Sequence, residues 1–177
     1  MRTIRSLILV FFVFAAAGIA FAEEPSHAFV GVKVCSMCHK KDEQGRQYPI
    51  WQESPHAKAF ETLGTPEAKK IGEERGIADP QQSGECLQCH STAYWFGTEK
   101  VTEKVPVEEG VSCESCHGPG KDYMKKSVME NKEMAVAAGL IIPNEQTCVK
   151  CHNENSPNYK SFDFAEFWPK IEHPIPE

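Results

Sequence analysis

The residues of this chain best suited to chemistry are its eight cysteines and seven histidines, and most of them share one spacing. A Cys-X-X-Cys-His pentapeptide begins at four positions, Cys35, Cys86, Cys113 and Cys148. Every cysteine belongs to one of these copies, and no cysteine is left over. Two thiols three positions apart lie on one side of a helical turn, and the adjacent imidazole can turn towards the same side. The repeat therefore predicts four equivalent sites.

This spacing is typical of covalent haem c attachment, in which the thiols form thioethers to the porphyrin and the histidine becomes the proximal iron ligand. The sequence thus predicts four covalently attached haem c groups, with iron as the metal. The expected attachment residues are Cys35, Cys38, Cys86, Cys89, Cys113, Cys116, Cys148 and Cys151. The expected proximal ligands are His39, His90, His117 and His152.

Three other interpretations use the same cysteines. The pairs could form two zinc ribbons with thiolate ligands, thioredoxin-like redox pairs, or four disulfides. None of these requires a histidine after every pair. We therefore interpret the motifs as haem sites.

The first 22 residues have the pattern of a cleaved secretory signal peptide. The basic residues Arg2 and Arg5 come first, and an apolar run from Leu7 to Ala20 follows. The small-X-small pattern of a cleavage site stands at Ala20 to Ala22. The apolar run is shorter than the roughly 20 residues of a bilayer span, although an uncleaved anchor remains the alternative. We expect a periplasmic or extracellular protein without a stable membrane anchor, in which residues 23–177 form one haem-binding domain.

The mature chain is acidic and short for its number of cofactors. Of 19 basic residues Arg2 and Arg5 lie in the leader, and all 25 acidic residues remain, so the mature net charge is −8. This charge disfavours nucleic acid and anionic membranes as partners. With fewer than about 40 residues per haem, the macrocycles must supply most of the apolar core.

Local signals predict short helices joined by loops. Ser54, Pro55 and Gly64 suit the ends of one helix, and Thr65, Pro66 and Gly76 those of a second. The valines of 101–107 indicate a hairpin or a loop. A third helix is expected from a cap at Asp122 to Ala138, ended by Gly139. Its methionines are more typical of core packing than of iron ligation.

Three histidines outside the motifs can serve as distal ligands. His56 shares a helix face with Ala59, Phe60 and Leu63, although a capping or core role is also open. His173 follows four large aromatic residues and is well placed to cap a haem. His27 lies near the mature N-terminus and is either solvated or a ligand.

Seven histidines cannot complete four bis-histidine haems. At least one iron therefore lacks a histidine from its own chain. His27 could instead ligate in a neighbouring molecule, which would give self-association.

Two extended motifs resemble the tetrahaem cytochrome c-554 family. They are Trp51 with Ser54 to Ala59, and Gly110 to Gly120 around the third attachment site. The resemblance covers most of the mature chain. Members of this family take electrons from hydroxylamine oxidoreductase, so redox partner proteins are expected here: an oxidoreductase-like donor and a reductase-like or cytochrome acceptor.

The resemblance implies a mainly α, loop-rich fold of short helices wrapped around four closely packed haems, with little β structure. It places His56 distal to the third haem beside His117, and His173 distal to the fourth beside His152. It also leaves the second haem five-coordinate, with His90 as its only protein ligand. The family takes the first haem's distal ligand from between the second and third sites, where residues 91–112 contain no histidine.

The leading functional prediction is an exported electron-transfer cytochrome without acid–base catalytic residues. One alternative is a haem enzyme that reduces a small nitrogen oxide or hydroxylamine at an open haem. Another is a subunit of an extracellular cytochrome filament.

Overall fold

A computed structural model describes residues 27–173 and Ile175 of the 177-residue chain. The expected signal peptide and the cleavage position near Glu23 lie outside these residues. In the part that is described, no helix has both the length and the apolar character needed to span a bilayer.

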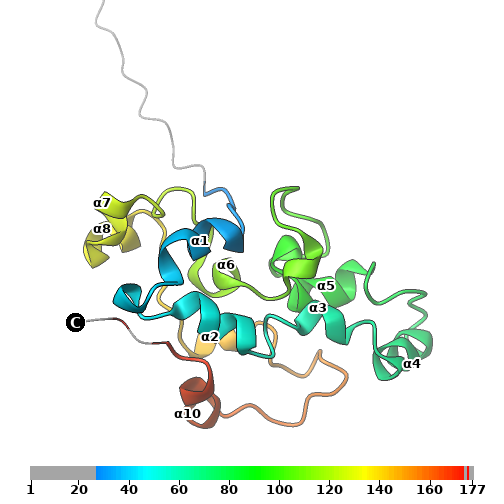
Figure 1. The fold of residues 1–177 in the computed structure, drawn as a ribbon. Helices are drawn as coiled ribbons and strands as arrows, with labels where there is room; N and C mark the ends of the chain where they lie inside the picture. The colour runs from blue at the N-terminus through cyan, green and yellow to red at the C-terminus, as the bar shows by residue number, and fades with distance from the viewer. Residues whose placement is uncertain (1–26, 174, 176–177) are drawn as a thin grey trace, which may run out of the picture.

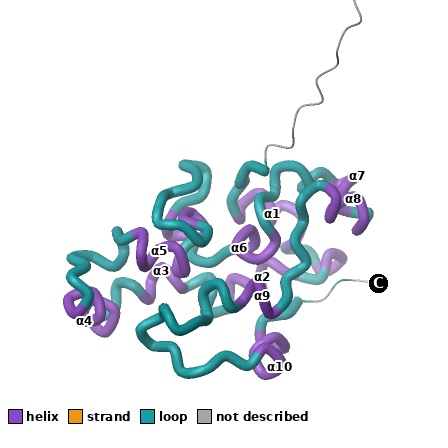
Figure 2. The backbone as a smooth tube through the Cα atoms, turned by 180° about the vertical axis from the view of Figure 1, so that it is seen from behind, coloured by secondary structure: helices purple, strands orange, loops and turns teal. Residues whose placement is uncertain are grey.

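Within the described residues every regular element is a helix, and loops make up much of the remainder (Figures 1 and 2). The expected mainly α, loop-rich fold is therefore confirmed. The α-helices are α1 Val32–His39, α2 Gln47–Glu53, α3 Ala59–Thr62, α4 Pro66–Glu74, α5 Gly84–His90, α6 Cys113–His117, α7 Lys126–Met129, α8 Lys132–Ala137, α9 Glu145–Cys148 and α10 Phe164–Phe167. Turns of 3-10 helix are η1 Asp42–Gln44, η2 Thr92–Tyr94, η3 Val107–Glu109 and η4 Trp168–Lys170.

Helix α4 matches its sequence signals. The Thr65 hydroxyl accepts a hydrogen bond from the Ala68 amide at 3.2 Å, and Pro66 occupies the first turn, where a missing N–H costs nothing. Gly76 follows the helix with φ of 71°, a conformation that favours glycine. This helix forms one end of the molecule in Figure 1.

The predicted helix from Ser54 to Leu63 is wrong in its boundaries. Helix α2, which sequence reasoning missed, ends at Glu53, and Ser54 is the extended residue after it. A residue that precedes proline disfavours the helical conformation, so Pro55 terminates α2. The Ser54 hydroxyl accepts a long 3.5 Å bond from the Ala57 amide, and α3 begins only at Ala59.

The predicted helix from Asp122 to Ala138 is also wrong in part. The Asp122 carboxylate accepts a hydrogen bond from the His27 amide at 2.9 Å and caps no helix. Helix α7 begins at Lys126, and a break at Asn131 separates it from α8. The Asn131 side chain accepts from the Met134 amide at 2.9 Å and so starts a new helix. Gly139 ends that helix at φ of 99°, as expected.

The valine-rich stretch 101–107 is a loop that supplies part of a small core. Val105 is fully buried with Phe29 and Ala93, and the Phe29 ring meets Trp95 edge-on at 5.2 Å. This cluster links the N-terminal segment to the chain after α5. So small a core agrees with the expectation that the cofactors provide much of the apolar interior.

Candidate haem-binding site

The attachment motifs lie at the ends of short helices. Helices α1, α5 and α6 each end on the motif histidine, whereas α9 ends on Cys148 and the rest of its motif forms a turn. No disulfide joins any of the eight cysteines. In the described residues no group of three or more His, Cys, Asp or Glu side chains is arranged to hold a bare metal ion.

Three of the motif histidines have one ring nitrogen held by an oxygen acceptor. Nδ1 of His39 lies 3.1 Å from Oε1 of Gln47. Nδ1 of His90 lies 2.8 Å from the Ala59 carbonyl oxygen, and Nδ1 of His117 lies 3.0 Å from that of Ile141. An acceptor at Nδ1 places the proton there and leaves the Nε2 lone pair for a metal. This arrangement fits the role of proximal iron ligand.

Two of the four motif histidines, His117 and His152, face a second histidine ring. The ring centres of His56 and His152 are 6.0 Å apart, and those of His117 and His173 are 5.8 Å apart. A metal bonded to one nitrogen of each ring would hold the two centres about 6 Å apart, because metal–imidazole bonds are about 2 Å long. Both pairs therefore have the separation of axial ligands on one iron.

These partners are exchanged relative to those that the family resemblance implies. The resemblance places His56 beside His117 and His173 beside His152, whereas the structure brings together the opposite pairs. The backbone of His56 is held in place, because its carbonyl oxygen accepts a hydrogen bond from the Val111 amide at 3.0 Å. From that position the ring points into the same cavity as His152.

Burial keeps these imidazoles in the neutral form that binds a metal. The pKa of His56 is lowered from its usual range chiefly by burial, with a smaller effect of His152. Burial likewise lowers the pKa of His117, His152 and His173. A neutral imidazole retains a lone pair for coordination.

The two motifs that carry the family resemblance pack on each other. The Trp51 indole N–H donates to the Val111 carbonyl at 2.8 Å. Gly110 has φ of 69°, and a Cβ there would lie 2.7 Å from the Ala57 carbonyl oxygen and 2.9 Å from that of His56. Only glycine allows this approach. The contact explains why both motifs are needed to position His56.

A cavity of about 770 Å³ joins the second and fourth attachment sites. Its lining includes Cys86, Cys89, His90, Cys151, His152 and His56. Interaction with Cys151 lowers the pKa of Cys89 to about 7, so the thiols of these two sites lie close together. In the same way, interaction with Cys113 lowers the pKa of Cys35. The first site is thus adjacent to the third, and the second to the fourth.

His27 has a different environment. Its ring is 55% exposed, lies 3.6 Å from the Asp122 carboxylate and packs close to Gly139. Within the described chain neither His39 nor His90 forms a ring contact with a second histidine. The structure therefore does not bring His27 to the first attachment site.

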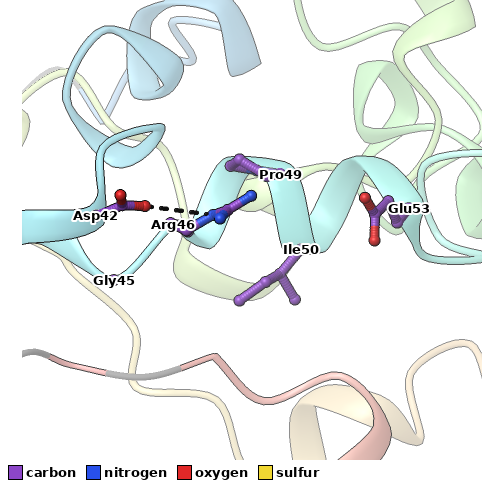
Figure 3. Close-up of a pocket in the computed structure, with 6 residues that line it drawn as sticks. All are labelled: Asp42, Gly45, Arg46, Pro49, Ile50 and Glu53. Carbon is purple, nitrogen blue, oxygen red and sulfur yellow. Dashed lines mark ion pairs between the residues drawn. The ribbon is translucent and has the colours of Figure 1, made fainter.

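A separate shallow cavity of about 330 Å³ lies at the start of α2 (Figure 3). Arg46 pairs with Asp42 across 3.6 Å at its edge, and Pro49, Ile50 and Glu53 line the helix side. No motif cysteine or histidine is among its lining residues.

Sequence reasoning missed the acceptors that orient the motif rings and one buried carboxylate. Two of the acceptors, at Ala59 and Ile141, are backbone carbonyls, for which the side chain gives no signal. The carboxylate belongs to Glu114, which is 1% exposed. A charged residue between two cysteines of a haem motif was the available signal, since motif helices pack close to the cofactor.

Comparisons with known proteins agree with the site. The family described as cytochrome c554 and c-prime matches residues 34–118, and the cytochrome c3 family matches residues 78–165. Cytochrome c-554 of Nitrosomonas europaea is 37% identical over 100 residues, which are 54% of this chain and 40% of that protein. The match thus spans well under half the length of this relative. No solved structure matches.

The two family matches together span all four attachment motifs, and the cysteines, oriented rings and facing histidine pairs supply the residues that haem c requires. In its motifs and in these matches the chain is similar to multihaem c-type cytochromes of the cytochrome c-554 kind.

Proposed function

We propose that the mature chain is an exported electron carrier with four covalently attached haem c groups. The observation that carries this proposal is the pair of facing imidazoles at two motif histidines, with ring centres 5.8 and 6.0 Å apart. When bound, each haem iron supplies a one-electron couple, and its potential depends on the axial ligands, hydrogen bonds and burial. The chain supplies the ligands and sets their orientation.

The proposed ligands follow from the ring contacts. His117 and His173 hold the third iron, and His152 and His56 hold the fourth. His39 and His90 are the proximal ligands of the first and second. Two imidazoles on one iron exclude outside ligands and keep both oxidation states in one geometry, which suits electron transfer.

The adjacent thiols support a close pairing of haems. We place the first haem beside the third, because Cys113 lowers the pKa of Cys35 and must lie near it. The second lies beside the fourth, because Cys151 lowers the pKa of Cys89 in the same way. Closely spaced cofactors pass electrons between their edges, so this arrangement would connect a donor protein to an acceptor protein outside the cytoplasm.

The second attachment site supports one further candidate activity. His90 faces a cavity whose wall includes the apolar side chains of Leu63, which follows α3, and of Ala68 and Ile71 in α4. None of these three side chains can ligate iron. An iron with one open face could bind and reduce a small nitrogen oxide or hydroxylamine.

The first experiment is mass spectrometry of the exported protein. We expect four haem additions on a chain that begins near Glu23. Recovery of zinc, or of disulfide-bonded cysteines without haem, would overturn the proposal.

Ligand assignment is tested with His56→Ala and His173→Ala. Each variant should convert one low-spin haem to high-spin, while His27→Ala, the control, keeps the parental spectrum. The exchanged pairing is tested in a chain without the fourth haem, made by Cys148→Ala with Cys151→Ala. His56→Ala should add no high-spin signal in that chain; a new signal would return His56 to the third haem.

The open second haem is tested with external ligands. Cyanide or nitric oxide should bind the second haem, and the first as well because His39 faces no second histidine, and should perturb the spectrum without displacing a histidine. Turnover of hydroxylamine or nitric oxide with a chemical reductant would favour the enzyme. Binding without turnover would leave electron transfer as the function.

A further inference from the structure

Glu114 is a buried carboxylate inside the third attachment motif. It is 1% exposed, although glutamate is among the residues least often buried in proteins. Oε1 accepts the Val30 amide at 3.0 Å and the Gly120 amide at 2.6 Å, and Oε2 accepts the Gly31 amide at 2.8 Å. So many contacts must serve a role that outweighs the cost of burying a charge.

The partners of Glu114 identify its charge state. Every hydrogen bond that the structure gives this side chain comes from a backbone N–H group. An ionised carboxylate only accepts hydrogen bonds, whereas a protonated one must also donate. The contacts therefore describe an anion solvated by amide dipoles. Such dipoles stabilise the anion without contributing an opposite unit charge.

The same contacts join two attachment sites that are distant in sequence. Val30 and Gly31 precede α1, the helix that carries the first motif, and their amides are otherwise left without helical acceptors. A second carboxylate, Glu109, accepts the next amide, that of Val32, at 2.8 Å. Gly120 ends the turn after the third motif. Glu114 thus fixes the start of α1 against α6.

Its position relative to the cofactor is set by the covalent chain. Glu114 lies between Cys113 and Cys116, the two thioether residues of the third site, and three residues before His117. A negative charge in a poorly solvated interior interacts strongly with nearby charges, because little water screens it. Net charge and hydrogen bonds around an iron centre shift its reduction potential.

We propose that Glu114 is a positioning residue that also lowers the reduction potential of the third haem. It holds the first and third attachment helices together, and its charge stabilises the oxidised iron relative to the reduced iron. This inference rests on the proposed function, since it requires haem at the third site.

The test is a spectroscopic redox titration of the haem-loaded protein and its Glu114→Gln, Glu114→Asp and Glu103→Gln variants. Glutamine removes the charge at nearly constant shape, so one couple should shift to higher potential. It should be the couple that His173→Ala also alters. Aspartate keeps the charge, and its couples should stay close to the parental values. Glu103, which is 90% exposed in its side chain, is the control and should shift nothing.

A second readout separates positioning from charge. Hydrogen exchange at the Val30 and Gly31 amides should accelerate in both Glu114 variants, because the shorter aspartate reaches them poorly. Faster exchange with all couples unchanged in Glu114→Gln would show a structural role alone and overturn the effect on potential. Unchanged exchange in both variants would overturn the positioning role.

If Glu114→Gln fails to load haem, Glu109→Gln takes its place. Glu109 is closer to solvent, so its removal should shift the same couple upward by a smaller amount; no shift would overturn the proposal. Failure of the proposed function looks different, since the parental protein would then lack four haems or His173→Ala would alter no couple.

Discussion

The third and fourth attachment sites carry the same pentapeptide but hold it in different ways. At the third site, the His117 ring is oriented by the Ile141 carbonyl, and Glu114 ties the motif to three backbone amides. At the fourth site, His152 stacks on the Phe162 ring at 4.9 Å and 18°. Phe162 in turn stacks on Phe167 at 5.6 Å.

This difference shows how far the polypeptide organises each site without the cofactor. Hydrogen bonds are directional and fix both the position and the orientation of a ring. Stacked rings define a plane but allow sliding within it. The third site is therefore organised by the polypeptide, whereas the fourth needs the cofactor to complete it. Four perturbations should break or sharpen this contrast.

Removal of one haem should have the largest effect. In Cys148→Ala with Cys151→Ala, hydrogen-exchange protection of residues 152–173 should fall by about 100-fold, because that segment then opens locally. Protection at Val30 and Gly31 should persist. In the matched variant Cys113→Ala with Cys116→Ala, protection at Val30 and Gly31 should persist, because Glu114 holds these amides without the cofactor, and only the segment around His173 should lose some protection. Equal losses in the two variants would erase the distinction between the sites.

Among single substitutions, Gly110→Ala should destabilise the protein most, because it strains the backbone. The added methyl meets the carbonyls of His56 and Ala57, and alanine disfavours φ of 69°, so the cost should be about 3 kcal/mol. One low-spin haem should become high-spin as His56 moves. Gly97→Ala is the control, because a Cβ added at Gly97 would lie 3.6 Å from the Tyr94 carbonyl oxygen, an ordinary contact distance. Urea unfolding and absorption spectra measure both effects.

Phe162→Ala should act on the fourth site alone. Loss of the stacked ring removes about 1 kcal/mol of aromatic contact and frees the His152 ring to turn. We expect faster cyanide binding at one haem, with the couple of the third haem unchanged. Phe164→Ala, which removes a ring stacked on Trp168 instead, should leave cyanide binding as it was.

Glu109→Gln should give the smallest effect, a change in the pH dependence of stability. Burial raises the pKa of Glu109 above its usual range, and Glu114 adds to this. Hydrogen bonds from Ser112 and Val32 and the charge of Lys33 oppose it. Because the folded state then binds the proton more readily, stability should fall as pH rises from the unfolded pKa through the folded one. The variant should lack this slope in urea unfolding between pH 4 and pH 7; an unchanged slope would contradict the assignment.

Sequence was sufficient to predict the class of cytochrome and one helix. The spacing of Cys113, Cys116 and His117 is a local covalent requirement, so it is visible without a fold. Helix α4 was equally predictable, since its caps at Thr65 and Gly76 are side-chain or backbone preferences of single residues.

The remaining features depend on contacts between distant segments. The pairing of distal histidines with motif histidines depends on the tertiary fold. The presence of seven histidines in the sequence does not determine it. The acceptors at Ala59 and Ile141 are backbone atoms. The burial of Glu114 depends on how α1 packs against α6, which its place between Cys113 and Cys116 does not reveal. Helix α2 was missed because proline is disfavoured inside a helix, as at Pro49, and no side chain caps its start.

The carboxylate of Glu114 also bears on the order of events during folding. Its bonds to Val30 and Gly31 join residues 84 and 83 positions apart. Contacts between residues so far apart form late, because the long loop between them must close first. Until the third motif reaches the start of α1, those two amides have no carboxylate to hold them. Closure of this loop therefore completes the junction between α1 and α6.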